Sequence, residues 1–146
     1  MTSRTYSFLS VSAAISGPNG SFNLSHGNTE GGISVTMRGP KNTLTIGADG
    51  SGMNSLHADN SCTVTVRLLK VSPVNTMLNG MYEQDRQAPQ VWGQNVITIR
   101  DINLGDVLSI KGCAFSKQPD VTYDKEGPAL EWTWDGAQVV ETLGSV

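Results

Sequence analysis

Two histidines and a few carboxylates are the side chains of this 146-residue sequence that could support catalysis. His26 and His57 are its only near-neutral bases, and both lie in glycine-rich stretches that are typical of loops. The sequence contains neither a G-x-S-x-G nucleophile elbow nor a G-x-x-x-x-G-K-[ST] phosphate-binding loop. Asp124, Glu126 and Glu131 could form a hydrolytic pair, but they flank the turn YDKEGP, where charged residues normally face water. We therefore expect no enzyme activity.

The metal-ligating residue types are equally sparse. The segment DGSGMNSLHADN resembles a calcium-binding loop, but it lacks the terminal glutamate that would bind the ion through both oxygens. His57 and Asp59 could ligate a metal, yet no third ligand follows them in the sequence. Cys62 and Cys113 show no CxxC spacing, so we interpret them as buried reduced thiols, with a single disulfide as the alternative. We expect no metal and no cofactor.

The composition indicates one β-rich domain over residues 1–146. Apolar residues make up 38% of the chain and charged residues only 16%, while 16 glycines and 6 prolines indicate many turns. The net charge of −3 argues against a protein that holds nucleic acid through its phosphates, but it suits one that nucleic acid slides past. No apolar run approaches a membrane span, and we interpret FLSVSAAI as a first strand, not as a signal peptide.

Alternating apolar and polar residues predict about nine strands. These strands are expected near residues 8–15, 22–24, 33–38, 42–46, 62–69, 96–100, 108–110, 121–123 and 130–134. The segments 33–38 and 42–46 are expected to form a hairpin around RGPKN. A long loop is expected to follow over 47–61.

One helix is predicted after the strand that begins at Cys62. Ser72 is a favourable N-cap, Pro73 fits the first helical position, and apolar residues recur at helical spacing as far as Tyr82. The helix is expected over residues 73–82, with Gly80 weakening its last turn near the end and EQDRQAPQ following as a polar connection. The resulting fold class is mainly β: an antiparallel barrel or sandwich with one short external helix.

Several predicted strands pair an apolar face with a face of serine and threonine, where exposed strands usually carry more lysine and glutamate. Such a face suits contact without tight binding, although the β-propensity of threonine explains it equally well. Arg38, Arg67 and Arg100 share the parity of these faces, either as salt-bridging residues at strand ends or as contacts between subunits. The candidate surface residues are Ser34, Thr36, Thr43, Thr45, Thr63, Thr65 and Thr98.

A β-sandwich that binds carbohydrate is an alternative function, and it would need an exposed aromatic platform. Trp92, Trp132 and Trp134 are the only tryptophans. Trp132 and Trp134 share the apolar parity of their segment with Leu130, so we expect them in the core instead.

The chain resembles the tail tube proteins of bacteriophages with contractile tails. The resemblance is carried by NTLTIGADGSGMNSLHADNSCTVTVRLLKVSPVNTML, WGQNVITIRD and YDKEGPALEWTWDG, and it extends from about Tyr6 to Gly144. It implies a fold shared with type VI secretion tubes, hexameric rings stacked helically into a tube, a surrounding sheath, and a lumen that holds the tape measure protein and passes DNA. It also implies a virion component that assembles in the host cytoplasm; another tube-forming or tail-completion protein is the alternative.

Under this resemblance the serine and threonine residues above are the candidates for the lumen lining. Segments 33–46 and 47–61 are expected to contact the next ring, and the helix to cover the outer side of the barrel. The candidate contacts between subunits are Arg38, Lys41, Asp49, Met53, His57, Arg67 and Arg100. The candidate residues facing the sheath are Glu83, Gln84, Asp85 and Arg86.

Overall fold

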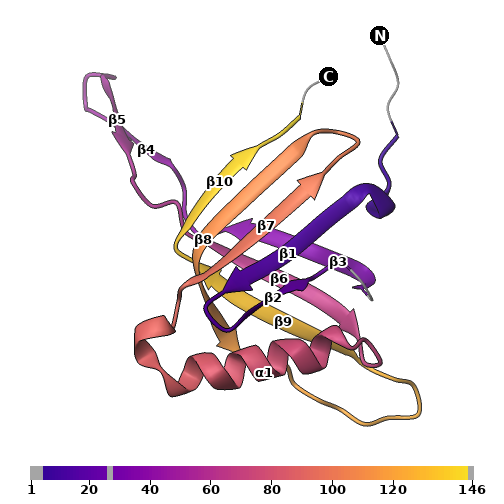
Figure 1. Ribbon diagram of the computed structural model, residues 1–146. Coiled ribbons are helices and arrows are strands. Elements are labelled where there is room, and N and C mark those ends of the chain that lie inside the picture. Colours follow the sequence, from indigo (N-terminus) through magenta and orange to yellow (C-terminus); the bar gives the residue numbers. More distant parts are fainter. Residues whose placement is uncertain (1–4, 26–27, 145–146) are drawn as a thin grey trace.

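The computed structural model describes residues 5–25 and 28–144 (Figure 1). In this part of the chain no helix is long and apolar enough to cross a membrane. Its elements are β1 (Val11–Gly17), β2 (Gly20–Asn23), β3 (Asn28–Met37), β4 (Asn42–Ile46), β5 (Gly52–Leu56), β6 (Cys62–Leu69), α1 (Val74–Gln87), β7 (Asn95–Asp101), β8 (Asp106–Lys117), β9 (Ala129–Gly136) and β10 (Gln138–Thr142), with short 3₁₀ turns at Phe8–Ser10 and Pro89–Val91.

Eight of these strands form one antiparallel sheet that folds into a sandwich, which confirms the predicted fold class. Seven follow the order β2-β1-β7-β8-β9-β6-β3, and β10 pairs beside β8. The first half of β8 pairs with β7 and β10, and its second half continues the sheet of β9, β6 and β3. Strand β8 changes sheets near Gly112, whose positive φ of 66° and close approach to Ala137 exclude a larger residue.

The core between the two sheets is built from the apolar sides of the strands. On β6 the buried residues alternate strictly with the others, and β9 buries Leu130, Trp132 and Trp134 in the same way. The ring of Phe115 on β8 contacts both indoles edge-on or tilted, at centroid distances of 6.0 and 5.4 Å. The prediction that these two tryptophans are core residues is confirmed, and it removes them as a carbohydrate platform.

Helix α1 lies across one end of the sandwich (Figure 1). Val74, Leu78 and Met81 point into the core, which explains the helical spacing of apolar residues in the sequence. The helix continues to Gln87, so the predicted end near Tyr82 is wrong. Gly80 is exposed and costs only about 1 kcal/mol relative to alanine, which buried contacts later in the helix offset.

The start of α1 differs from the prediction by one residue. Pro73 occupies the N-cap position and Val74 is the first helical residue. Ser72 still contributes, because its hydroxyl oxygen accepts a hydrogen bond from the Val74 N–H at 3.4 Å.

The predicted hairpin of 33–38 with 42–46 is wrong. Strand β3 pairs with β6, placing Thr36 opposite Thr63, whereas β4 pairs with β5 in a separate two-stranded sheet. The expected loop over 47–61 therefore contains a strand. Ala48 and Asp49 are the central residues of the hairpin turn, because the Gly50 N–H donates to the Gly47 carbonyl oxygen at 3.0 Å, and Gly50 has a positive φ of 91°. The β4–β5 hairpin projects away from the sandwich (Figure 1).

Two other expected strand segments are irregular. Leu9 falls in the 3₁₀ turn before β1 and is 96% exposed, so the inward face of the first strand begins only at Val11. Val121 and Tyr123 lie in the exposed connection between β8 and β9, because Pro119 and Pro128 bracket a segment without ladder hydrogen bonds.

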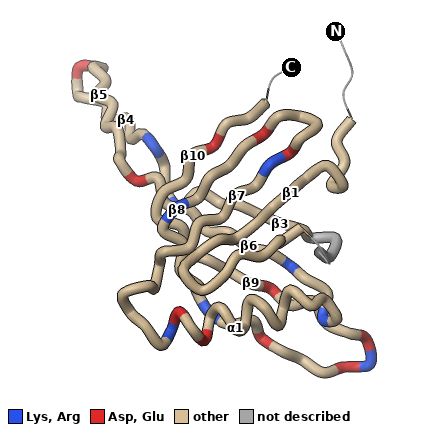
Figure 2. Tube along the Cα trace, in the orientation of Figure 1, with Lys and Arg blue, Asp and Glu red and all other residues tan. Residues whose placement is uncertain are grey.

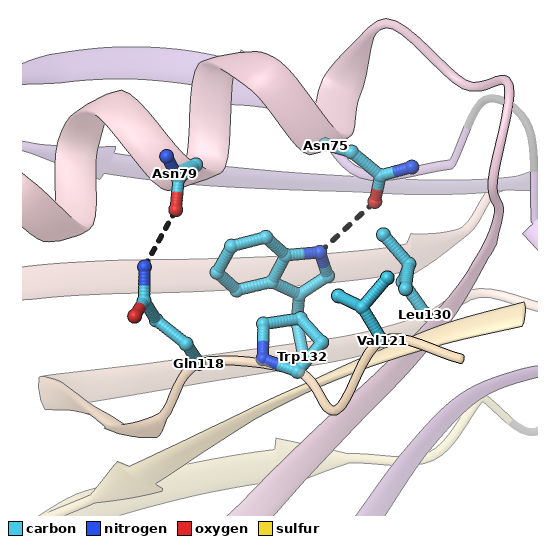
Figure 3. Close-up of a pocket in the computed structure, with 7 residues that line it drawn as sticks. Asn75, Asn79, Gln118, Val121, Leu130 and Trp132 are labelled. Atoms are coloured by element: carbon cyan, nitrogen blue, oxygen red, sulfur yellow. Dashed lines mark hydrogen bonds between the residues drawn. The ribbon is translucent and has the colours of Figure 1, made fainter. Parts of the chain in front are cut away.

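Asn75 ties the first turn of α1 to both neighbouring parts of the sandwich (Figure 3). Its side-chain oxygen accepts a hydrogen bond from the buried Trp132 indole N–H at 3.0 Å. Its amide nitrogen donates to the carbonyl oxygens of Leu69, at 2.8 Å, and Lys70. One side chain thus satisfies the buried indole and the end of β6.

Replacing Asn75 with alanine is expected to lower the free energy of unfolding by about 1–3 kcal/mol, since the Trp132 N–H would remain buried without an acceptor. The control is Thr76→Ala at the neighbouring exposed position, which should change stability by less than about 0.5 kcal/mol. Urea unfolding followed by tryptophan fluorescence measures both. Equal stabilities of the two variants would contradict the role assigned to Asn75.

Candidate functional site

The outer surface of β3, β6 and β9 is a continuous face of hydroxyl-bearing side chains, here called the polar face. Strand register places Ser34 opposite Thr65 and Thr65 opposite Thr133. One step along, Thr36 lies opposite Thr63. Their inward neighbours on β6 and β9 fill the core, so the same pleat that buries the tryptophans turns these hydroxyls outward.

Each arginine on the polar face has a carboxylate from β9 beside it. The Arg67 Nε lies 3.0 Å from a Glu131 carboxylate oxygen, with which it forms a hydrogen bond. Arg38 lies 3.8 Å from Asp135 at the other end of the face. All four side chains are about half exposed, so the pairs add little stability. Their consequence is electrostatic, because neither arginine presents an uncompensated positive charge.

The predicted lumen residues do not form one surface. Ser34, Thr36, Thr63 and Thr65 are on the polar face. Thr98 is on the outer side of the other sheet, between Ala14 of β1 and Ser109 of β8. Thr43 and Thr45 are on the projecting hairpin. Alternation in a sequence gives the parity of a residue within its strand, but it does not say which sheet the strand joins.

Thr133 belongs to the polar face and was missed by the sequence reasoning. The signal was present, because residue 133 alternates with the buried tryptophans of β9. It could have been identified only by knowing that β9 is the neighbour of β6, since that pairing places Thr133 beside Thr65.

The predicted contacts between subunits divide into three groups. Lys41, Asp49, Met53 and His57 lie on or beside the β4–β5 hairpin. Arg38 and Arg67 lie on the polar face, as ion-paired residues. Arg100 is exposed on β7, opposite Ser12 of β1, and makes no ion pair within the described ranges 5–25 and 28–144.

Polar contacts support the hairpin at its base and tip, where its charges also lie (Figure 2). Near the base, the Lys41 ammonium donates to the Asp59 carbonyl oxygen and to Asn60, and the Thr43 hydroxyl lies 2.6 Å from the His57 ring nitrogen. At the tip, hydrogen bonds from Ser51 lower the pKa of Asp49. The strands between base and tip are uncharged.

The predicted sheath-facing residues lie in the last turns of α1. The prediction is wrong for one of them, Asp85. Gln84 and Arg86 are exposed and Glu83 is half-buried. Asp85 is 1% exposed and points inward, where its two oxygens accept hydrogen bonds from the amides of Asn95, at 2.9 Å, and Asn19. Asp85 therefore anchors the helix to β7 and to the β1–β2 turn.

The residue types that could support catalysis are dispersed. Glu131 is paired with Arg67, and Asp124 and Glu126 lie in the exposed connection before β9. No group of three potential metal ligands occurs within the described residues, and His26 lies outside them. Cys62 and Cys113 are free and buried, as predicted, and burial raises the pKa of the Cys113 thiol to about 12.

A pocket of about 260 Å³ lies between α1 and the connection that follows β8 (Figure 3). Its amide groups are already engaged within the chain: Asn75 accepts from Trp132, and Gln118 donates to Asn79 at 2.7 Å. The Gln118–Asn79 bond holds the connection against the helix and the Trp132–Asn75 bond holds β9 against it, so both have structural roles.

Comparisons with known proteins agree with the architecture. Residues 3–144 match the family model described as Bacteriophage PhiTE tail tube protein. No curated protein matches the chain in sequence.

Several solved structures are similar to the chain. A chain of the anti-feeding prophage (AFP) baseplate has a TM-score of 0.61 and 10% identity, with 97% of each chain covered. Chains of an extracellular contractile injection system, PVC, are also similar. One, from its sheath/tube terminator, has a TM-score of 0.60 and 16% identity, covering 89% of this chain and 92% of that chain. Another, from its sheath-tube complex in the extended state, has a TM-score of 0.59 and 13% identity, covering 90% of this chain and 88% of that chain. At such identities the likeness shows a shared fold.

Replacing Asp85 with alanine is expected to destabilise the protein by about 1–3 kcal/mol, because two amide groups lose their buried acceptor. The exposed neighbour offers a matched control, Gln84→Ala, which should stay within about 0.5 kcal/mol of the parent. Urea unfolding at a low protein concentration measures both. If Asp85→Ala left the free energy of unfolding unchanged, the anchoring role would be contradicted and Asp85 would again be a candidate surface contact.

Proposed function

This chain belongs to the family of bacteriophage PhiTE tail tube proteins, and from this premise we propose that it forms hexameric rings stacked into a conduit for DNA within a contractile sheath. Membership of the family makes it a structural subunit of a phage tail tube and thus a virion component. The number of subunits, the cytoplasmic assembly in the host, the sheath, the tape measure protein and the passing DNA are parts of the proposal.

The polar face is the observation that carries the proposal, as the surface that would line the lumen. Its hydroxyl groups from Ser34, Thr65 and Thr133 hydrogen-bond water, and its arginines are paired with carboxylates. DNA binding depends on cations that neutralise phosphates, and affinity grows with their number. A lining whose positive charges are already compensated would let DNA pass without holding it. It would likewise accommodate a tape measure protein before ejection.

An open strand edge supports assembly into rings. Strand β3 ends the sheet path, and its outer edge pairs with no strand among the described residues. Long exposed edges invite pairing with another chain unless they are blunted. We propose that a neighbour's sheet continues from this edge, so that the polar faces of successive subunits join around the lumen. Such a head-to-tail contact closes a ring.

The other two surfaces take the remaining contacts. The β4–β5 hairpin would reach the adjacent ring, since it projects from the body and exposes apolar side chains. The outer side of α1, with Gln84 and Arg86 exposed and Glu83 beside them, would face the sheath. Residues 33–37 belong to the proposed lumen wall instead of to the ring-to-ring contact, because they form part of β3.

The proposal predicts concentration-dependent assembly of the purified chain. Negative-stain electron microscopy over a concentration series, together with a sizing column, should show rings with sixfold end views and longer hollow tubes. A tail-completion protein would instead stop at single rings. A monodisperse monomer at every concentration and salt would contradict the proposal.

A further inference from the structure

The β4–β5 hairpin has one apolar face that no other part of the described chain covers. The register places Leu44 opposite Asn54, Leu56 opposite Asn42 and Ile46 opposite Gly52, and all six residues share one side of the hairpin. Leu44, Ile46 and Leu56 are 58%, 59% and 88% exposed. An isolated two-stranded hairpin is marginal in water. This one therefore requires a partner surface to gain stability.

An open groove lined by both apolar and polar side chains lies elsewhere on the sandwich, at the unpaired side between the two sheets. It has a volume of about 290 Å³. Val11, Ile33, Val35 and Leu108 line it and pack against the core from outside while remaining partly exposed. The groove lies on the open side of the sandwich, because β2 and β3 end the strand path and, within the described residues, neither β1 nor β2 pairs with β3.

Aromatic and terminal residues form the wall and rim of this groove. Tyr6 and Phe8 come from the segment before β1, and Leu143 follows β10. Tyr6 is 62% exposed and Leu143 is 66% exposed. Asp106 and Glu141 provide the polar rim. A strip of apolar side chains on a slender element is the shape that such a groove would accept.

We propose that the apolar face of the β4–β5 hairpin docks into this groove of a second copy of the chain. The inference rests on the proposed tube and names the surface that receives the hairpin. Two features favour a second copy as the occupant. The hairpin projects away from the sandwich of its own chain (Figure 1). A hairpin-in-groove contact also joins two different surfaces, as head-to-tail assembly requires. Docking covers the open side of one sandwich with the exposed apolar side chains of the hairpin of another copy.

Cysteine cross-linking tests this contact in the full-length chain. Leu44→Cys on the hairpin is combined with Leu143→Cys in the groove, and the assembled protein is treated with a short bifunctional maleimide. The native thiols of Cys62 and Cys113 are buried, and burial raises the pKa of both, so they contribute few reactive thiolates. The unmodified chain gives the background of the reaction.

The matched control replaces the groove cysteine with Val71→Cys, an 87% exposed position before α1. Every chain of the Leu44→Cys and Leu143→Cys double variant carries both halves of the contact. Docking therefore predicts a ladder of covalent oligomers and loss of the monomer band for this variant. The Leu44→Cys and Val71→Cys pair should leave the monomer band largely intact. A mixture of the two single variants, Leu44→Cys and Leu143→Cys, should stop at covalent dimers.

Electron microscopy of the same samples separates this inference from the proposed function. Tubes with a specific ladder support both, and a specific ladder without tubes supports the docking contact alone. Tubes that show no ladder, or the same ladder with the control pair, would overturn the docking contact and leave the tube intact. An internal cross-link confined to monomers would overturn it in favour of the chain's own hairpin. Absence of both tubes and ladder would overturn both proposals.

Discussion

The packing of Trp132 and Trp134 between the two sheets is the constraint on which the rest of the structure depends. Both indoles are almost completely buried against Phe115, and they fix which side of β9 faces inward. Because side chains alternate with a period of two, a slip of one residue would turn the indoles to water and the hydroxyls inward. The same packing therefore sets the outward direction of Thr133 and, through the register with β6, of Thr65.

Three surface features outside this core are suited to contact with other copies of the chain. Its polar face is uncharged apart from side chains that have opposite charges nearby, its edge strand β3 is open, and its hairpin exposes apolar residues. Buried polar groups hold the helix instead. Asn75 and Asp85 fix its two ends to the sandwich.

Much of this fold can be predicted from local sequence pattern. The predictions that fail are those that depend on which strands pair. Alternation identified the core sides of β6, β7 and β9, and helical spacing identified the buried side of α1. Neither pattern states which strands become neighbours, so β4 was assigned to β3, and Thr98 was grouped with residues on another sheet. The local sequence predicts a surface residue at Asp85, because its partners, Asn19 and Asn95, are distant in sequence. The carboxylate partners of Arg38 and Arg67 likewise become visible only once β9 lies beside β6.

We propose that the polar face of β3, β6 and β9 lines the lumen of an assembled tube. A helical reconstruction by cryo-electron microscopy, made from tubes assembled from the purified chain, tests it most directly. The account predicts Ser34, Thr65 and Thr133 at the inner wall, with α1 on the outside of the tube. A reconstruction with these three residues on the outer surface, or with the Thr98 face of the other sheet at the inner wall, would contradict it.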